Sequence, residues 1–325
     1  MATRKRLSLL LLQLLLVLAL HLAHAHRLKL RFYKNTCPNA EAIVRNTTYK
    51  FISKAPTLAA ALLRMHFHDC FVRGCDGSVL LTSSKENAER DASPNRSLRG
   101  FQVIDAVKSA LEEACPCTVS CADIIALVAR DAVSLIGGPF WDLPTGRRDG
   151  RVSLKSEVRP NVPSPSSNVT VLKQMFSVKG LSVKDLVVLS GSHTIGISHC
   201  RSFGNRLYNF TGKGEADPSM DPNYVVWLKK KCKPGDRTTL VEMDPGSFRT
   251  FDVNYYKVVT QRRGLFQSDA ALLNDVQTQA YVKLQAENDG VSFAGDFAIS
   301  MVKMGKIGVL TGKASEIRKK CAFVN

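Results

Sequence analysis

The most constraining feature of this 325-residue sequence is its set of nine cysteines, because a chain cross-linked at many points can adopt few folds. In an oxidising compartment, eight cysteines would form four disulfides and leave one over. Sequence alone leaves about 105 ways of pairing eight of them. The cysteines are Cys37, Cys70, Cys75, Cys115, Cys117, Cys121, Cys200, Cys232 and Cys321.

The first 25 residues have the features of a secretory signal peptide. Basic residues at 4–6 precede an apolar run at 7–22, and Ala23 and Ala25 fit a small-x-small cleavage site. A membrane anchor is the alternative, but the run is short for a spanning helix. No later segment has about 18 apolar residues in succession, so we expect no membrane association after cleavage. N-glycosylation sequons fit the same route and stand at Asn46, Asn95, Asn168 and Asn209.

The charge balance narrows the class of partner. The formal net charge is +17, and removal of the three basic leader residues leaves 17 − 3 = +14. A basic secreted protein is expected to adsorb to acidic polysaccharide or to anionic surfaces. Nucleic acid is the alternative partner, but the charges are scattered and no nucleic-acid motif is present.

The pattern of apolar residues is mostly helical, and strand signals are weak and short. Proline and capping residues mark several helix starts, as at Asp221-Pro222. With 45% hydrophobic residues, the chain can bury a sizeable core. We therefore predict an all-α fold with a seam near 150–170. The expected helices are 38–53, 57–68, 101–114, 120–135, 168–178, 183–190, 197–208, 221–231, 252–262, 275–290 and about 296–307.

One predicted helix presents an arginine and a histidine on the same face. Arg64 and His68 are four residues apart, Phe67 borders them, and His66 points away. A neutral imidazole facing a cavity can act as a general base, and a fixed guanidinium can stabilise negative charge. The alternatives are a buried histidine with a surface ion pair, or zinc bound by His66, His68, Asp69 and a cysteine. The i, i+2 histidine spacing argues against zinc.

The segment after this helix is rich in oxygen ligands. Asp69, Asp76 and Ser78 offer side-chain oxygens, while Gly74 and Gly77 permit turns that expose carbonyls. Calcium takes six to eight such ligands, so the segment is a candidate calcium loop, although its spacing is not that of an EF-hand. A polar loop without an ion is the alternative.

Two long motifs resemble those of the class III plant secretory peroxidases. Residues 64–76, Arg-Met-His-Phe-His-Asp-Cys-Phe-Val-Arg-Gly-Cys-Asp, match the distal-site signature, and residues 185–196 resemble the proximal haem-ligand motif. The resemblance runs from about residue 32 to Cys321. It implies a two-domain all-α architecture with haem b between a distal half, about 26–165 plus the C-terminal helix, and a proximal half, about 166–290.

The resemblance also implies the roles of the residues around the haem. His193 would be the axial ligand of the iron, and Asp269, in Gly-Leu-Phe-Gln-Ser-Asp, would make its imidazole more basic. His68 would be the distal acid–base, and Arg64 would stabilise the leaving oxygen. The remaining positions are Phe67, which would line the cavity, Asn95, which would accept a hydrogen bond from His68 and stay unglycosylated, and Pro163, which would border the donor entrance.

Two Ca²⁺ ions follow from the same resemblance. The distal ion would be held by Asp69, Val72, Gly74, Asp76 and Ser78, with Glu89 reached through a water. The proximal ion would be held by Thr194, Asp244, Ser247, Thr250 and Asp252.

The resemblance further implies the disulfides Cys37–Cys115, Cys70–Cys75, Cys121–Cys321 and Cys200–Cys232. Cys117 is then the odd cysteine. It could be a free thiol, an intermolecular link or a competitor for Cys37, and the sequence does not choose among these.

Together these features predict a secreted, monomeric haem peroxidase that reduces hydrogen peroxide and oxidises phenolic donors in one-electron steps. Removal of peroxide, lignin-type oxidation in the wall and a response to oxidative stress are the expected roles. A non-catalytic wall-binding protein on the same fold is the alternative. It predicts the loss of a catalytic residue, whereas all five positions, Arg64, His68, Asn95, His193 and Asp269, are filled. The short stretch after Cys321 favours the wall over the vacuole, and the physiological donor stays open.

Overall fold

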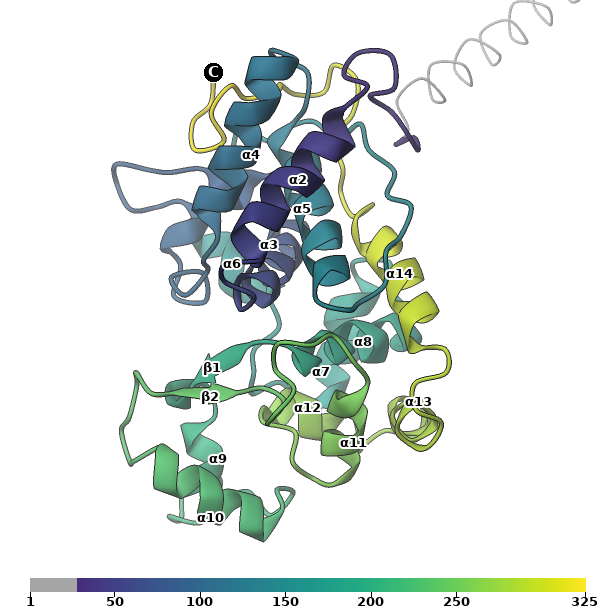
Figure 1. Ribbon diagram of the computed structural model, residues 1–325. Helices are drawn as coiled ribbons and strands as arrows, with labels where there is room; N and C mark the ends of the chain where they lie inside the picture. Colours follow the sequence, from purple (N-terminus) through teal and green to yellow (C-terminus); the bar gives the residue numbers. More distant parts are fainter. Residues whose placement is uncertain (1–27) are drawn as a thin grey trace, which may run out of the picture.

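Helices form most of the regular structure in residues 28–325, the part of the chain that this computed structural model describes (Figure 1). The all-α prediction is confirmed, since the described residues contain only two short strands besides helices. The predicted signal peptide, residues 1–25, lies outside the described residues. In the described part, no helix combines the length and apolarity that crossing a membrane requires.

The first group of helices occupies the upper part of Figure 1. It comprises α2 (Ala40–Ile52), α3 (Leu58–Val72), α4 (Phe101–Ala114), α5 (Cys121–Leu135) and the short α6 (Val158–Asn161). Helix α5 is buried over nearly its whole length and packs against α2, α3 and α4. It begins at Ser120, whose hydroxyl accepts a hydrogen bond of 3.1 Å from the Asp123 amide.

The second group lies in the lower part of Figure 1. It comprises α7 (Val169–Ser177), α8 (Val183–Ser190), α9 (Gly204–Tyr208), α10 (Pro222–Lys231), α11 (Asn254–Thr260), α12 (Gln267–Ala271) and α13 (Val276–Glu287). Helix α14 (Phe293–Met304) packs against α8 and returns the chain toward the first group. Helix α8 starts with a reciprocal capping box between Ser182 and Asp185.

Two predictions of local structure were wrong, and two short helices were missed. The segment 197–208 is not one helix: Ile197–His199 forms strand β1, which pairs antiparallel with β2 (Leu240–Glu242), and helix α9 begins only at Gly204. Gly196, at φ +98°, turns the chain just before β1, and tertiary pairing then overrides helix propensity. Helices α6 and α12 were not predicted. Helix α3 continues to Val72 rather than ending at 68, because residues 70–72 are buried apolar positions.

The main hydrophobic core extends through both groups of helices, from Tyr33 and α2 to Met304 at the end of α14. A second, smaller core surrounds the Cys200–Cys232 disulfide between α9, α10 and β2. The main core is continuous across residue 165, and the predicted division into halves there stays a prediction.

The structure contains the four disulfides that the resemblance implied, Cys37–Cys115, Cys70–Cys75, Cys121–Cys321 and Cys200–Cys232. Cys117 is a free, exposed thiol.

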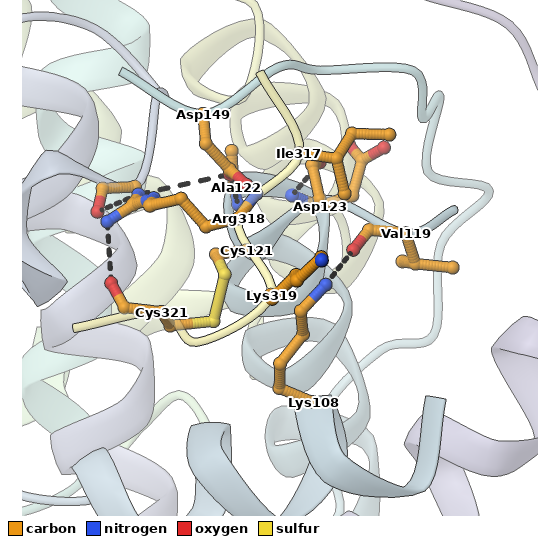
Figure 2. The surroundings of a disulfide bond; sticks show 12 residues. Lys108, Val119, Cys121, Ala122, Asp123, Asp149, Ile317, Arg318, Lys319 and Cys321 are labelled. Atoms are coloured by element: carbon orange, nitrogen blue, oxygen red, sulfur yellow. Dashed lines mark hydrogen bonds and ion pairs between the residues drawn. A yellow bond between two sulfur atoms is a disulfide. The ribbon is translucent and has the colours of Figure 1, made fainter. Parts of the chain in front are cut away.

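The disulfide Cys121–Cys321 ties the C-terminal segment to the start of α5, and Figure 2 shows a buried arginine beside it. The guanidinium of Arg318 donates hydrogen bonds of 2.6 Å to the carbonyl oxygens of Gly77 and Cys321. A Cβ atom on Gly74 would lie only 2.6 Å from backbone atoms of Gly308. The loop after α3 is therefore held against the last part of the chain.

Candidate active site

The distal histidine is held by an asparagine from a neighbouring loop. His68 is buried on α3, and its Nδ1 lies 2.6 Å from Oδ1 of Asn95. Because an amide oxygen only accepts hydrogen bonds, Nδ1 carries the proton and Nε2 is left unprotonated in the neutral ring. Asn95 in turn donates through Nδ2 to the carbonyl oxygen of Glu89 at 2.9 Å. Asn95 is 1% exposed, which leaves no room for a glycan there.

Electrostatics keep the His68 imidazole neutral. Burial, and secondarily the charge of Arg64, hold the pKa of His68 well below its ordinary value. Burial, with Arg99 and Arg201 nearby, lowers the pKa of Arg64 to about 10, so Arg64 stays charged at neutral pH. Its guanidinium donates to the Pro94 carbonyl at 2.8 Å and to the Ser97 hydroxyl at 3.2 Å. No pattern in the sequence predicted these two partners of Arg64.

His66 lies on another side of α3, as the spacing predicted. It is 1% exposed, and its Nδ1 lies 3.6 Å from Sγ of Cys70, which is bonded to Cys75. Burial, followed by the charge of Arg147, lowers the pKa of His66 to about 3. The two histidines therefore face different surroundings, which removes the basis of the zinc alternative.

The second histidine is paired with a buried carboxylate. His193 lies in the 3₁₀ turn Gly191–Thr194 after α8, and its Nδ1 is 2.7 Å from Oδ1 of Asp269. Asp269 lies in the first turn of α12, where its other oxygen accepts a hydrogen bond of 2.8 Å from the Phe266 amide. The unpredicted helix α12 therefore fixes the partner of His193.

Two aromatic residues complete the surroundings of His193. The ring of Phe266 lies edge-on at 5.3 Å between centroids, and that of Tyr255 at 6.0 Å. The Tyr255 hydroxyl donates to Oδ1 of Asp269 at 3.1 Å. The sequence prediction missed Tyr255, although a buried tyrosine hydroxyl needs a hydrogen-bond partner and its position in α11 could have raised the question.

His68 and His193 line the same cavity, which has a volume of about 780 Å³. Asn95 and Asp269 are not among its lining residues. Each therefore contacts its histidine, through Nδ1, from outside the cavity. The cavity brings together predicted residues from α3, from the loop around Pro163 and from the turn after α8. They are Arg64, Phe67, His68, Pro163 and His193.

Buried acceptors without donors surround the loop after α3. Asp69, Asp76, Ser78 and Glu89 are all buried. One oxygen of Asp69, the Ser78 hydroxyl and both carboxylate oxygens of Glu89 have no hydrogen-bond partner. Burial raises the pKa of Asp69 and of Asp76, and raises that of Glu89 to about 8. Such a set favours a bound cation, which would satisfy the oxygens together.

Val72 ends α3, and Gly74, at φ +102°, follows in the turn. Because neither residue has a side-chain oxygen, each can offer only its backbone carbonyl. No group of three or more His, Cys, Asp or Glu side chains within residues 28–325 is arranged to hold a metal. The donors around the loop after α3 are carboxylate, hydroxyl and carbonyl oxygens, which suit calcium rather than zinc.

The predicted proximal residues also lie together. Thr194 donates to Asp252 at 2.8 Å and to Asp244 at 3.2 Å, and the Ser247 hydroxyl bonds to Asp252. Burial raises the pKa of Asp244 to about 6. Thr250 is exposed, and its amide donates to the Ser247 carbonyl at 2.8 Å.

Comparison with known proteins gives the class. A family model described as "Peroxidase" matches residues 44–288, most of the chain, and two histidines with these partners across one cavity agree with it. The chain is therefore a peroxidase.

The relatives narrow the family. The chain is 60% identical over 298 residues to "Peroxidase 27" of Arabidopsis thaliana, with 92% of each chain covered. It is 59% identical over 300 residues to "Peroxidase 1" of the same plant, again with 92% of each covered. It is 57% identical over 305 residues to "Peroxidase 1" of Oryza sativa subsp. japonica, covering 92% of this chain and 93% of the relative. The chain belongs to the plant class III peroxidase family.

Proposed function

We propose that this class III peroxidase binds haem b in the cavity between His68 and His193 and oxidises phenolic donors there. The observation that carries the proposal is the unlike support of the two histidines. His68 is held by a neutral amide and His193 by a carboxylate, at 2.6 Å and 2.7 Å. A carboxylate makes the His193 imidazole a strong ligand for iron, whereas the amide leaves His68 free as a base.

The chemistry of the cavity fits haem b. Apolar side chains from α7, α8 and α14 form much of its wall, including Leu172, Leu186 and Met301. Arg99, Arg201 and His199 also line it, and they would meet the two carboxylates of haem b. When bound, haem supplies the electrons that cleavage of the peroxide O–O bond requires.

His68 is proposed to move one proton during that cleavage. Its Nε2 takes a proton from one oxygen of hydrogen peroxide and delivers it to the other oxygen, which leaves as water. Arg64 stabilises the negative charge on the departing oxygen, and Phe67 restricts the space around it. Over a full turnover, two donor molecules give two electrons and two protons, so one hydrogen peroxide becomes two waters.

The two proposed Ca²⁺ sites flank the two histidines. The distal set, Asp69, Val72, Gly74, Asp76, Ser78 and Glu89, is supported by its unpartnered buried oxygens. The proximal set, Thr194, Asp244, Ser247, Thr250 and Asp252, begins at the residue after His193. Each ion would fix the backbone next to a reacting group, which is the expected contribution of calcium to activity.

Donor access is proposed at Pro163, on the rim of the cavity beside Ser164 and Ser166. We further propose a monomer that is secreted to the cell wall, where its positive charge would hold it on acidic polysaccharide. Lignin-type oxidation, removal of peroxide and a response to oxidative stress are the proposed roles. The non-catalytic alternative is set aside, because the family is enzymatic and all five catalytic positions are filled.

The test is the visible spectrum of the purified mature protein before and after one equivalent of hydrogen peroxide. We expect a haem band that peroxide changes and that a phenol restores. His193→Ala should lose the band, whereas His68→Ala should keep it and react with peroxide orders of magnitude more slowly. A wild-type protein without a haem band, when produced with haem and calcium, would refute the proposal.

A further inference from the structure

The residues that line the cavity carry positive charge without any carboxylate to balance it. Five arginines and three histidines line it, and no Asp or Glu does. Arg64 is engaged by Pro94 and Ser97. No ion pair within residues 28–325 involves any of the other four, which are Arg99, Arg159, Arg201 and Arg237.

Arg159 differs from the other three in its position. It lies on α6, four residues before Pro163, and its side chain is exposed. It lines the main cavity and also a smaller adjoining hollow of about 290 Å³, which is bordered by two further basic residues, Arg96 and Lys155. The rim near Pro163 therefore continues into a basic surface made of Arg96, Lys155 and Arg159.

Two carboxylates near this basic surface, those of Glu157 and Asp91, are already engaged. Glu157 accepts two hydrogen bonds from Arg73, at 2.7 and 2.8 Å. Asp91 accepts from the Ala88 amide at 3.0 Å. Arg96 and Lys155 reach only backbone carbonyl oxygens, so they keep their full positive charge. The basic surface thus presents three cations at one side of the donor entrance.

We infer that Arg159, supported by Arg96 and Lys155, selects phenolic donors that carry a carboxylate. The inference rests on the proposed function, which places donor access at Pro163. The phenol ring lies at the rim near Pro163, and the carboxylate lies against the Arg159 guanidinium. The phenol gives up one electron and one proton and becomes a phenoxyl radical, and the carboxylate does not react. An arginine holds a carboxylate with two parallel hydrogen bonds, and the surrounding charge raises its rate of encounter.

The test compares two donors that differ only in charge, 3-(4-hydroxyphenyl)propanoate and its methyl ester. With the holoenzyme, kcat/KM is measured for both donors at low and high salt. We expect the acid-to-ester ratio to fall about two- to five-fold in Arg159→Gln, the range of an exposed ion pair, and further in Arg159→Glu. Salt should lower the ratio in the wild type more than in Arg159→Gln, because exposed charges are screened.

Lys230→Gln is the matched control. Lys230 is exposed on α10, at the bottom of the molecule in Figure 1, whereas α6 belongs to the upper group of helices, so this change removes one positive charge away from the rim. It should leave the ratio unchanged. An equal fall in this control would assign the effect to net charge and overturn the inference.

The remaining outcomes are also decisive. An unchanged ratio in both Arg159 variants, or an equal loss for acid and ester, would overturn the role of Arg159. The proposed function fails separately, when the wild type oxidises neither donor or shows no haem band. A wild type that oxidises the ester normally but does not favour the acid overturns this inference alone.

Discussion

Asn95 links His68 to the loop residue Glu89 through two hydrogen bonds. His68 Nδ1 lies 2.6 Å from Oδ1 of Asn95, and Nδ2 of Asn95 lies 2.9 Å from the Glu89 carbonyl oxygen. The proposed base, His68, is therefore held through Asn95 by the backbone of a residue whose own side chain is a proposed calcium ligand. A disturbance of the distal metal loop should reach the base through Asn95.

Asn95→Leu should slow the reaction with hydrogen peroxide. Without the amide oxygen, His68 loses the partner that fixes its tautomer and ring orientation, and so part of a general-base contribution that is typically about 10²–10⁴-fold. Stopped-flow mixing of the haem-loaded variant with peroxide measures the rate constant. A normal rate constant, with haem content equal to the wild type, would remove Asn95 from this role.

The rate of reaction with peroxide should persist in mild acid. Burial and Arg64 hold the pKa of His68 well below its ordinary value near 6.5, so the neutral base survives until the pH falls through that lowered pKa. We expect the acid limb of the rate to lie well below pH 6.5. Arg64→Leu should move the acid limb to higher pH, because loss of the positive charge raises the pKa of His68. If the wild-type rate instead fell with a midpoint near pH 6.5, the buried, Arg64-facing position of His68 would be contradicted.

Calcium should stabilise the protein more at pH 8 than at pH 5. In metal-free protein, burial raises the pKa of Glu89 from 4.5 to about 8, so between these values the folded state binds more protons than the unfolded state. The stability of the metal-free protein therefore falls as the pH rises through this window. Bound calcium would offset this loss, because it stabilises the ionised carboxylate of Glu89. The gain in Tm should be larger at pH 8 by about 5 °C or more, since 1 kcal/mol is about 2–4 °C in a large domain.

Glu89→Gln is the control for this experiment. It removes the titrating group, so the metal-free variant should lose much of the pH dependence. Thermal unfolding is followed by circular dichroism at pH 5 and pH 8, with and without chelator. This gives four Tm values for the wild type and four for the variant. An equal calcium effect at both pH values in the wild type would show that Glu89 does not face the ion.

Tyr255→Phe should lower the reduction potential of the bound haem. The hydroxyl donates to Asp269 at 3.1 Å, and its removal leaves the carboxylate a stronger acceptor for His193. A more basic imidazole stabilises oxidised iron. We expect a shift of about −30 mV, half a decade in the one-electron equilibrium. Spectroelectrochemical titration measures it, and a positive shift or none would show that Tyr255 only packs.

Cys117→Ser should leave peroxidase activity unchanged. Cys117 is exposed and lies outside all four disulfides, and an exposed substitution usually changes stability by less than about 0.5 kcal/mol. A thiol reagent should label the folded wild type at one site and the variant at none. A large loss of activity would mean that the thiol exchanges with the nearby Cys37–Cys115 disulfide.

The sequence predicted the elements whose signal is local. Periodicity placed α4 and α8 correctly, and the motifs around Arg64 and His193 led to residues that share one cavity. It failed where long-range contacts decide. Strand β1 exists because it pairs with β2, more than 40 residues away, and α12 is a short helix whose cap is the partner of His193. The contact of Tyr255 with Asp269, and the lack of ion pairs at the rim arginines within residues 28–325, depend on which side chains meet in the folded chain. The periodicity of the sequence carries no information on such contacts.

Arg318 and the Cys121–Cys321 disulfide hold the loop after α3 against the C-terminal segment, and this contact has a consequence for biosynthesis. The loop that carries Asp76 and Ser78 is completed by residues near 308–321, over 200 positions later in the chain. A chain emerging from the ribosome can pack α2–α5 early, yet it cannot close that loop until the last segment has been made. Calcium capture in the distal site should therefore follow the end of synthesis, and slow closure of such a distant contact would set its timing.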